Sequence, residues 1–352
     1  MGTIKVSELN TGDFLSKAVY INDFQPLFYE GTRLTSDDIE RLINEGIKEV
    51  SIFEDSSRRI KKKEKEVITK EVHEDCTVKV KKLLNTHVCS NSANLQELAG
   101  TAEDIVDGIF KCDDVAVRIY DIKQSSGDLY DHAVSLSSLS ILTALKFNLH
   151  HDEVCDIGVG SLLHDLGLKF LSINYLDRDP STFTPEEMFE YKKHTLYGFS
   201  SVEEEKWMAT SSKRIVLQHH ERLDGTGFPF KQKSIPLPVR IVSVCDGFLD
   251  RISGIGQKAM KVDEALLDIE KYRDTYYDGK VVDIFEAFIA MYPVGTNVLL
   301  SSGEEGVVIE QSEYFTDRPS VKITKNAKGD PVTRNKVVNL SENSYISIVK
   351  SL

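Results

Sequence analysis

The sequence predicts a mainly α-helical protein, with a central helical bundle between a small N-terminal α/β module and a small C-terminal β module. Apolar residues recur at helical spacing from about residue 92 to residue 290, and strand-like alternation is nearly absent there. After Tyr292-Pro293-Val294-Gly295 the pattern changes to short apolar runs separated by turn residues. A length of 352 residues suits two or three domains, and 41% hydrophobic residues can build a sizeable core.

Residues 1–57 are predicted to form the N-terminal module. A helix is expected after Thr35-Ser36-Asp37-Asp38, where polar residues precede apolar ones at helical spacing. Strands are expected at Phe14–Tyr20, Pro26–Tyr29 and Glu49–Phe53. The charged stretch 58–91 is interpreted as a linker helix, and a patch for an anionic ligand is the alternative.

Residues 92–290 are predicted to be the helical domain, and residues 291–352 the β module. The expected strands of this module are Val298–Leu300, Gly306–Ile309, Val321–Ile323, Val337–Leu340 and Tyr345–Val349.

Charge and cysteine usage restrict the class of partner and the compartment. A net charge of -13 argues against a nucleic acid polymer or a membrane surface as partner, but not against a small anionic ligand. The five cysteines form no C-x-x-C pair, which indicates reduced thiols. The first residues lack an apolar signal, and no stretch is long enough to span a membrane. We therefore expect a cytoplasmic protein.

Two His-Asp pairs occur, and their contexts differ. His151-Asp152 opens a predicted helix, where an aspartate suits the N-terminus, so this pair is interpreted as structural. His164-Asp165 follows a largely apolar helix, where ionisable groups are costly without partners. Gly167 is expected to cap the end of that helix.

Other ionisable residues also fall on apolar faces of predicted helices. They are His132, His194, His219-His220 and Asp246. Each alone has an ordinary interpretation, such as a core histidine with satisfied hydrogen bonds. Together, histidines and aspartates on successive helices are typical ligands of Fe, Mn or Zn ions. A carboxylate such as Asp165 can bridge two ions, and such a pair can activate water against a phosphate ester.

A longer motif surrounds the histidine pair, and it resembles a known family. It reads His219-His220-Glu221-Arg222-Leu223-Asp224-Gly225-Thr226-Gly227-Phe228-Pro229 and continues with Ile235-Pro236-Leu237, Arg240-Ile241-Val242 and Asp246. In order and approximate spacing, these residues and the upstream histidines resemble the HD-GYP domain over about residues 125–265.

The resemblance implies an HD-superfamily helical bundle with a binuclear or trinuclear centre that hydrolyses cyclic di-GMP. One metal would be held by His132, His164, Asp165 and Asp246. Asp165 would bridge to a second metal held by His194, His219 and His220. The expected cofactors are two divalent ions, with iron first and manganese as the alternative. Asp128, one turn before His132, is a candidate ligand of a third metal or simply a surface residue at a helix start.

Several positions depart from the family pattern. The lysine that usually follows the His-Asp pair is displaced by one position to Lys169, and Phe228 replaces the usual tyrosine. The family usually carries Arg-Pro-Tyr followed by a basic residue. The corresponding stretch here is Ile255-Gly256-Gln257-Lys258, in which only the basic residue, Lys258, is kept. Asp165 and Lys169 are assigned to catalysis. Lys169, Arg222 and Lys258 are assigned to substrate binding, and Lys169 has a solvated side chain as its alternative interpretation.

Two function classes follow. The first is a metal-dependent phosphodiesterase that hydrolyses a cyclic dinucleotide, cyclic di-GMP above all, by metal-activated water. The alternative is a weakly active or inactive module that binds metal and serves as a cyclic dinucleotide sensor or signalling partner. In that case Gly227-Phe228-Pro229 is the expected protein-docking segment. A related hydrolase acting on another nucleotide, and a homodimer, remain open.

Overall fold

The computed structural model describes most of the chain. Described are residues 2–52 with short gaps, 70–86, isolated positions between 97 and 107, and then 128–175, 178–253, 258–312, 314–332 and 336–352. Residues 58–69 and 87–91 of the predicted linker and the Ile255-Gly256-Gln257 departure lie outside the described residues. The chain divides into two units, Met1–Glu64 and Lys65–Leu352, which are treated separately below.

The N-terminal unit contains two antiparallel strand pairs and one helix. β1 (Gly2–Lys5) pairs with β4 (Glu49–Ile52), and β2 (Val19–Asn22) pairs with β3 (Gln25–Phe28). α1 (Ser36–Asn44) begins where the polar start signal predicted it. The sequence did not predict β1, because Gly2–Lys5 offers only four residues of weak alternation. The small core gathers Val6, Leu15, Leu27, Phe28, Leu34, Leu42 and Val50.

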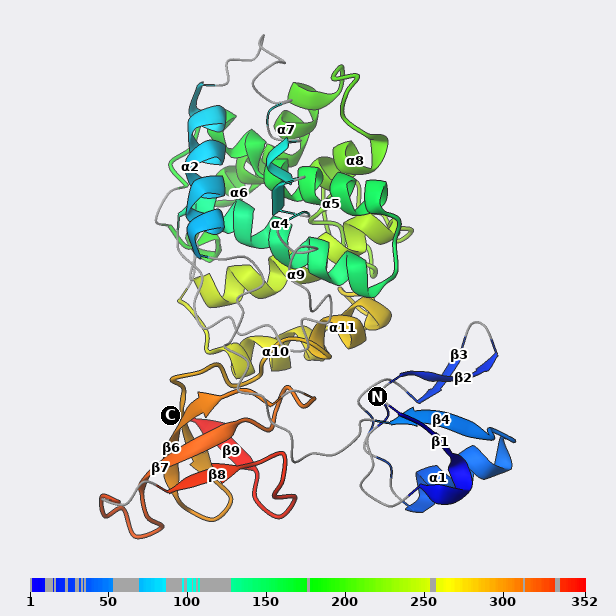
Figure 1. Ribbon diagram of the computed structural model, residues 1–352. Helices are drawn as coiled ribbons and strands as arrows, with labels where there is room; N and C mark the ends of the chain where they lie inside the picture. The colour runs from blue at the N-terminus through cyan, green and yellow to red at the C-terminus, as the bar shows by residue number, and fades with distance from the viewer. Residues whose placement is uncertain are drawn as a thin grey trace. The chain divides into compact units, whose positions relative to one another are not determined.

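The second unit is dominated by a helical bundle (Figure 1). Its helices are α2 (Lys70–Thr86), α4 (Leu129–Lys146), α5 (His151–Leu163), α6 (Pro185–Lys192), α7 (His194–Val202), α8 (Thr210–Gln218), α9 (Leu237–Ser253), α10 (Val262–Lys271) and α11 (Gly279–Glu286). Short 3-10 helices are η1 (Val6–Glu8) in the first unit and η2 (Leu166–Phe170) and η3 (Pro180–Thr182) in this one.

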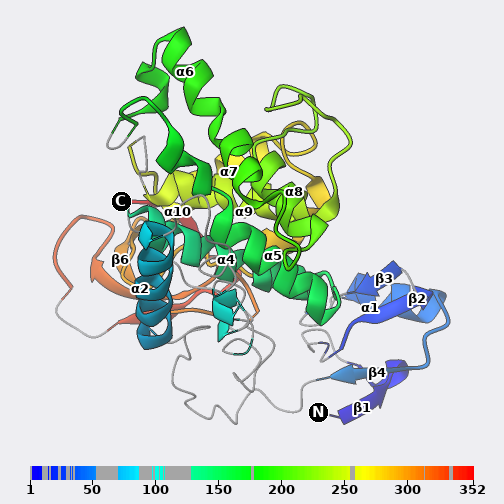
Figure 2. The same cartoon turned by 90° about the horizontal axis from the view of Figure 1, so that it is seen from above.

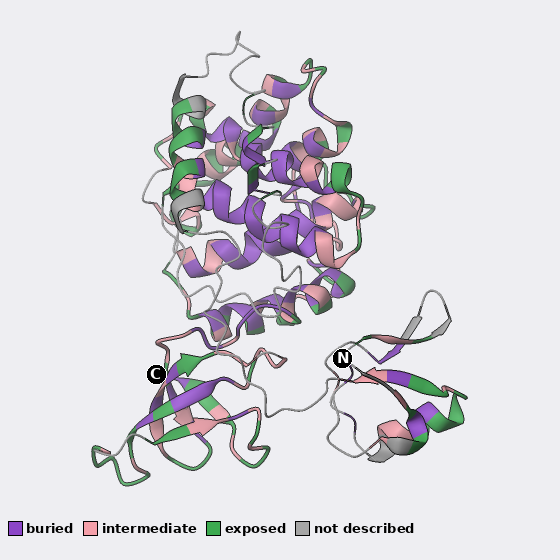
Figure 3. Ribbon diagram, in the orientation of Figure 1, coloured by how far each residue is buried: buried purple, intermediate pink, exposed green. Residues whose placement is uncertain are grey.

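Helix α4 is the centre of the bundle. Both views place it between α2 and α5, and it also packs against α9 (Figure 1 and Figure 2). Every residue from His132 to Ala144 is buried, as expected for a helix covered on all sides (Figure 3). Two of its buried hydroxyls are satisfied within the helix, since Ser138 and Thr143 donate to carbonyls one turn earlier. A histidine in this helix therefore lies in the dry interior.

The C-terminal residues form an antiparallel sheet in the order β8-β7-β6-β5-β9. Its strands are β5 (Asn297–Leu300), β6 (Glu305–Glu310), β7 (Ser320–Lys325), β8 (Val337–Asn339) and β9 (Ile348–Ser351). Each coincides with or overlaps a strand predicted from the sequence. The predicted fold class, a helical bundle with small terminal modules, is confirmed.

The prediction that Gly167 caps the end of a helix is wrong. It does not adopt the positive φ of a helix cap but lies inside η2, against the first turn of α7. A Cβ at this position would overlap the carbonyl of His194 and approach the amide of Gly198 at 2.5 Å. The glycine therefore permits a close backbone crossing, and this crossing brings His194 next to Asp165.

The interpretation of His151-Asp152 agrees with the structure. Both residues are exposed in the first turn of α5, where Asp152 suits the positive end of the helix dipole. Cys76, Cys155 and Cys245 are free thiols, whereas Cys89 and Cys112 lie outside the described residues. Within the described part of the chain, every helix is too short or too polar to cross a bilayer.

Candidate metal centre

The candidate centre is assembled from the ends and faces of five helices. His132 lies in the first turn of α4, and Asp246 lies within α9. His164-Asp165 follow the last residue of α5, His194 begins α7, and His219-His220 follow the last residue of α8. Helix ends hold a side chain on a rigid support while leaving room for the next residue to turn, so adjacent residues can both point inward.

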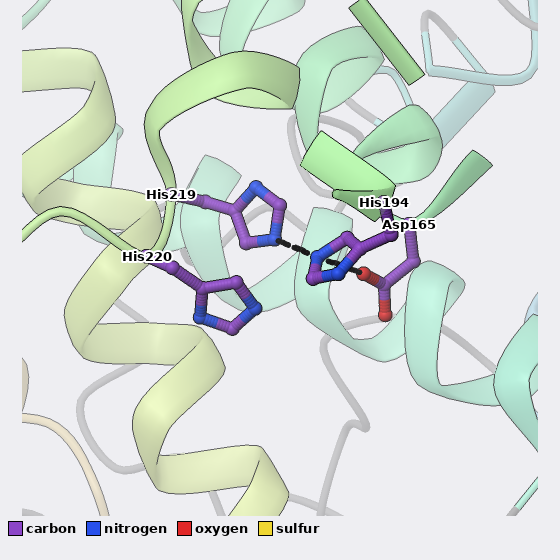
Figure 4. A group of neighbouring side chains, drawn as sticks. All are labelled: Asp165, His194, His219 and His220. Atoms are coloured by element: carbon purple, nitrogen blue, oxygen red, sulfur yellow. Dashed lines mark hydrogen bonds and ion pairs between the residues drawn. The ribbon is translucent and has the colours of Figure 1, made fainter. Parts of the chain in front are cut away.

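The inward-pointing side chains form two groups, each able to offer three or more ligand atoms within 4.8 Å of one another. The first group is His132, His164 and Asp246, and all three are buried. Asp246 Oδ1 lies 3.1 Å from His132 Nε2 and 3.7 Å from His164 Nε2. The second group is Asp165, His194, His219 and His220 (Figure 4). All seven residues predicted as metal ligands are therefore brought together.

Asp165 connects the two groups. Its Oδ2 lies 3.1 Å from His164 Nε2, on the side of the first group. Its Oδ1 lies 3.4 Å from His194 Nε2 and 3.7 Å from His219 Nε2, on the side of the second. A carboxylate with one oxygen toward each group has the geometry needed to bridge two ions.

Backbone carbonyls fix the orientation of three imidazoles. His164 Nδ1 donates to Ser161 O at 2.7 Å, and His194 Nδ1 donates to Tyr191 O at 2.8 Å. His219 Nδ1 lies 3.1 Å from the carbonyl of Ile215. Because Nδ1 is bonded to the backbone in each ring, Nε2 is the nitrogen that points into the centre. This is the usual outer support of metal-binding histidines.

The electrostatics of the centre favour a cation. Burial lowers the pKa of His194 to about 4, so this imidazole is neutral near pH 7. Burial opposes protonation of His164 too, but Asp165 and Asp246 raise its pKa to about 9. Burial would raise the pKa of Asp165, yet His164 and its neighbours hold it well below the ordinary value. Carboxylates that attract a proton to His164 would attract a divalent ion in the same way.

The donor set fits divalent metal ions. His194 Nε2 and His219 Nε2 lie 3.4 Å apart, although both lone pairs point inward. His164 Nε2 is buried and, although Asp165 Oδ2 lies 3.1 Å away, no described residue meets it with hydrogen-bond geometry. Buried imidazoles and carboxylates gathered in one place suit Zn, Fe or Mn, whereas a purely apolar core would leave these groups uncompensated.

Comparison with known proteins gives the family. A model of the HD domain matches residues 119–296, which contain all seven clustered residues, and a model of the KOW domain associated with HD domains matches residues 297–352. An HDG"Y"P protein from Bdellovibrio bacteriovorus shares the fold, with a TM-score of 0.52 at 18% identity over 81% of this chain and 97% of that one. The chain belongs to the HD-GYP family. Members of the HD domain family bind divalent metals.

Curated relatives of this HD-GYP chain are named cyclic di-GMP phosphodiesterases. One, from Pseudomonas aeruginosa, is 29% identical over 68% of this chain and 59% of its own length. Another, from Thermotoga maritima, is 32% identical over 45% of this chain and 44% of its own length. The chain thus spans less than two thirds of either relative.

Asp250 lies beside the candidate metal centre, and the sequence analysis did not single it out. It follows Asp246 by one turn on α9, and its Oδ1 lies 3.9 Å from His132 Nε2. Burial raises the pKa of Asp250 to about 7, and the charge of Asp246 adds to this shift. The i, i+4 spacing from Asp246 was the available signal.

Asp128, the candidate ligand of a third metal, lies in different surroundings. Asp128 caps α4, where its Oδ1 accepts from the amides of Tyr130 and Asp131. It is not a member of either group of candidate ligands among the described residues. The third-metal role of Asp128 is therefore still a prediction, and its structural alternative has direct contacts.

The basic residues assigned to substrate are only partly directed at the centre. Lys169 is exposed in η2, with its Nζ 5.7 Å from the centroid of the Phe170 ring. Lys258 is also exposed, shortly before α10. Arg222 instead donates to the carbonyls of His219 and Glu221 and to Ser243 Oγ. Its guanidinium braces the turn that carries the histidine pair.

The Gly227-Phe228-Pro229 segment lies against the centre. The Phe228 ring packs on His220, with 4.6 Å between ring centroids. The buried carboxylate of Glu221 holds the following loop, because it accepts from the amides of Phe230 and Gln232 at 2.7 and 2.9 Å. The sequence motif thus combines two ligand candidates with the residues that fix the turn after them.

Proposed function

We propose that this chain hydrolyses a phosphodiester bond of a cyclic dinucleotide, with cyclic di-GMP as the first candidate. The observation that carries the proposal is the pair of adjoining ligand groups joined by Asp165. The names of the curated relatives support the choice of substrate class.

The residues would divide the work as follows. His132, His164 and Asp246 would hold one divalent ion, His194, His219 and His220 a second, and Asp165 both. Two such ions, iron or alternatively manganese, would supply Lewis-acid stabilisation of a phosphoryl group and make water a better nucleophile. The bonds from Nδ1 to backbone carbonyls would keep each imidazole oriented, with Nε2 directed at the ion.

Basic side chains would bind the substrate phosphates. Lys169 lies four residues after Asp165 in the short helix η2, and Lys258 lies beyond the end of α9. Exposed lysines on flexible stems can reach a phosphate as point charges. We propose this role for both, and a bracing role for Arg222, whose donors are directed at the protein.

A substrate panel tests the activity. Purified chain loaded with Fe²⁺ or Mn²⁺ is incubated with cyclic di-GMP, cyclic di-AMP and cyclic GMP-AMP, and linear products are separated by chromatography. The proposal predicts a linear dinucleotide or mononucleotide from cyclic di-GMP, loss of product in Asp165→Ala, and normal activity in His151→Gln. Full metal loading with no product from any of the three would refute it.

A sensor without turnover is the second candidate. It is favoured by the exposed, displaced Lys169 and by Phe228, which keeps an aromatic ring on His220 but lacks the hydroxyl donor of tyrosine. Calorimetry of metal-loaded protein with cyclic di-GMP separates the two functions. Binding without product would favour the sensor, and absence of binding would exclude it.

Protein docking through the Gly227-Phe228-Pro229 segment is also proposed. Phe228 is half-buried, whereas Phe230 just after it is 52% exposed and is the apolar side chain that a partner can reach. A Phe230→Asp variant tests docking with less disturbance of the histidines than Phe228→Asp. Undiminished partner binding in both variants would count against this surface. A homodimer is a further proposal, and sedimentation of the full chain tests it.

A further inference from the structure

A cavity lies between the C-terminal half of α8 and the loop that precedes α9. It has a volume of about 360 Å³. Its lining residues are Arg214, Gln218, Gln232, Ser234, Ile235 and Pro236. None of them belongs to the two candidate ligand groups. Pockets for small ligands span roughly 300–1,000 Å³, so this one suits a ligand smaller than a dinucleotide.

The floor of the cavity contains a polar group that lacks a partner. Gln218 is only 8% exposed, and its Oε1 makes no hydrogen bond with any described residue. Its Nε2 donates to Gln232 Oε1 at 2.9 Å, which holds the two amides together. A buried amide oxygen without a donor is costly, and a ligand carrying an N–H or O–H group would compensate it.

The rim of the cavity is cationic. Arg214 is exposed on α8, and no carboxylate of the described chain forms an ion pair with it. Ser234 and the amide of Gln232 add polar groups beside it, and the exposed Lys231 and Lys233 flank Gln232 in the loop. A guanidinium recognises phosphate and carboxylate oxygens by paired hydrogen bonds. In a chain of net charge -13, such a rim marks a local preference for anions.

We propose that this cavity binds a small phosphate monoester of mononucleotide size, at a site separate from the metal centre. Arg214 would hold the phosphate at the rim, with Ser234 and Gln232 beside it. A donor group of the ligand would reach Gln218 on the floor. Gln218 directly precedes His219 in the chain, so the test must separate the two sites.

Metal removal provides that separation. Chelator-treated full-length protein is titrated calorimetrically with inorganic phosphate and with guanosine monophosphate. We expect both to bind in the absence of metal and the nucleotide to bind more tightly, since it can also reach Gln218. Arg214→Gln should lower the affinity for the nucleotide about tenfold or more, because a charged hydrogen-bond donor is lost.

Lys213→Gln is the matched control. Lys213 precedes Arg214 on α8, but its Nζ donates to the carbonyl of Glu203 instead of lining the cavity. This variant should bind the nucleotide as the unaltered chain does. Nucleotide binding that disappears with the metal, or that is equal in Arg214→Gln and the unaltered chain, would overturn the proposal. Either result leaves the assignment of the metal centre untouched.

Discussion

The Nε2 atoms of His194 and His219 face each other at 3.4 Å in a fully buried site. Each ring already gives its Nδ1 proton to a backbone carbonyl, so two lone pairs are directed at one small volume. Two acceptors in this position repel each other unless a cation lies near both. The contact is therefore better explained by metal coordination than by a hydrogen bond within the core.

Chelation should lower the stability of the folded chain. An ion that binds only the folded state adds roughly 2.7 kcal/mol when its concentration is 100 times its dissociation constant. Thermal unfolding with and without EDTA measures this effect. His194→Ala should lose much of the EDTA-sensitive stability. His151→Gln, which alters an exposed histidine outside the centre, should keep all of it. An EDTA shift that is absent, or the same in His194→Ala, would contradict the prediction.

Gly167→Ala should destabilise the chain by about 3 kcal/mol or more. The added methyl would overlap the carbonyl of His194, and backbone atoms on both sides cannot easily move. Denaturant unfolding provides the measurement, and metal content should fall with it. Gly100→Ala is the control, because a Cβ there meets nothing within 4 Å. Equal stability of the two variants would show that the close crossing of η2 and α7 is wrong.

Arg222→Ala should lower the stability of the folded chain, and any effect on substrate binding should be secondary. It removes donors to the carbonyls of His219 and Glu221 and to Ser243 Oγ, which predicts a loss of about 2–3 kcal/mol in the free energy of unfolding. A direct role in substrate binding would instead raise KM and leave unfolding unchanged. Denaturant titration together with steady-state kinetics distinguishes these outcomes.

Glu286→Gln should stabilise the chain at alkaline pH. Burial, assisted by Glu270, raises the pKa of Glu286 to about 7 from an ordinary value of 4.5. The folded state thus binds a proton that the unfolded state releases between these values, so this group lowers stability as pH rises from 4.5 to 7. Because Glu286 is only partly buried, we expect a gain of about 1–2 kcal/mol at pH 8 and none at pH 4. Equal gains at both values would refute the assigned cause.

The sequence was most informative where a polar residue interrupts an apolar helix face. His132 and Asp246 follow this rule, and the structure buries both beside each other. Asp250 was missed because it lies at the end of the same stripe, near the end of α9, and its side chain is 38% exposed. Its approach to His132 depends on the tertiary packing of α9 against α4, which periodicity does not encode.

Glycine and arginine positions were harder to interpret from sequence. Gly167 fits a helix cap by its place after α5, but the reason for it is the backbone of α7, contributed by residues far along the chain. Arg222 has the chemistry of a phosphate ligand, yet it donates to carbonyls of its own turn and to Ser243 Oγ on α9. Both cases depend on contacts that no local pattern reveals, whereas the strands of the β module were predictable from local runs and turn residues.

The most direct test of the central claim is the metal content of the purified chain, measured by elemental analysis beside Asp165→Ala and His151→Gln. Because Asp165 lies between the two ligand groups, we predict about two ions per chain in the unaltered protein and in His151→Gln, and a clear loss in Asp165→Ala. Metal content well below one ion per chain after loading, or content unchanged by Asp165→Ala, would contradict the proposed centre.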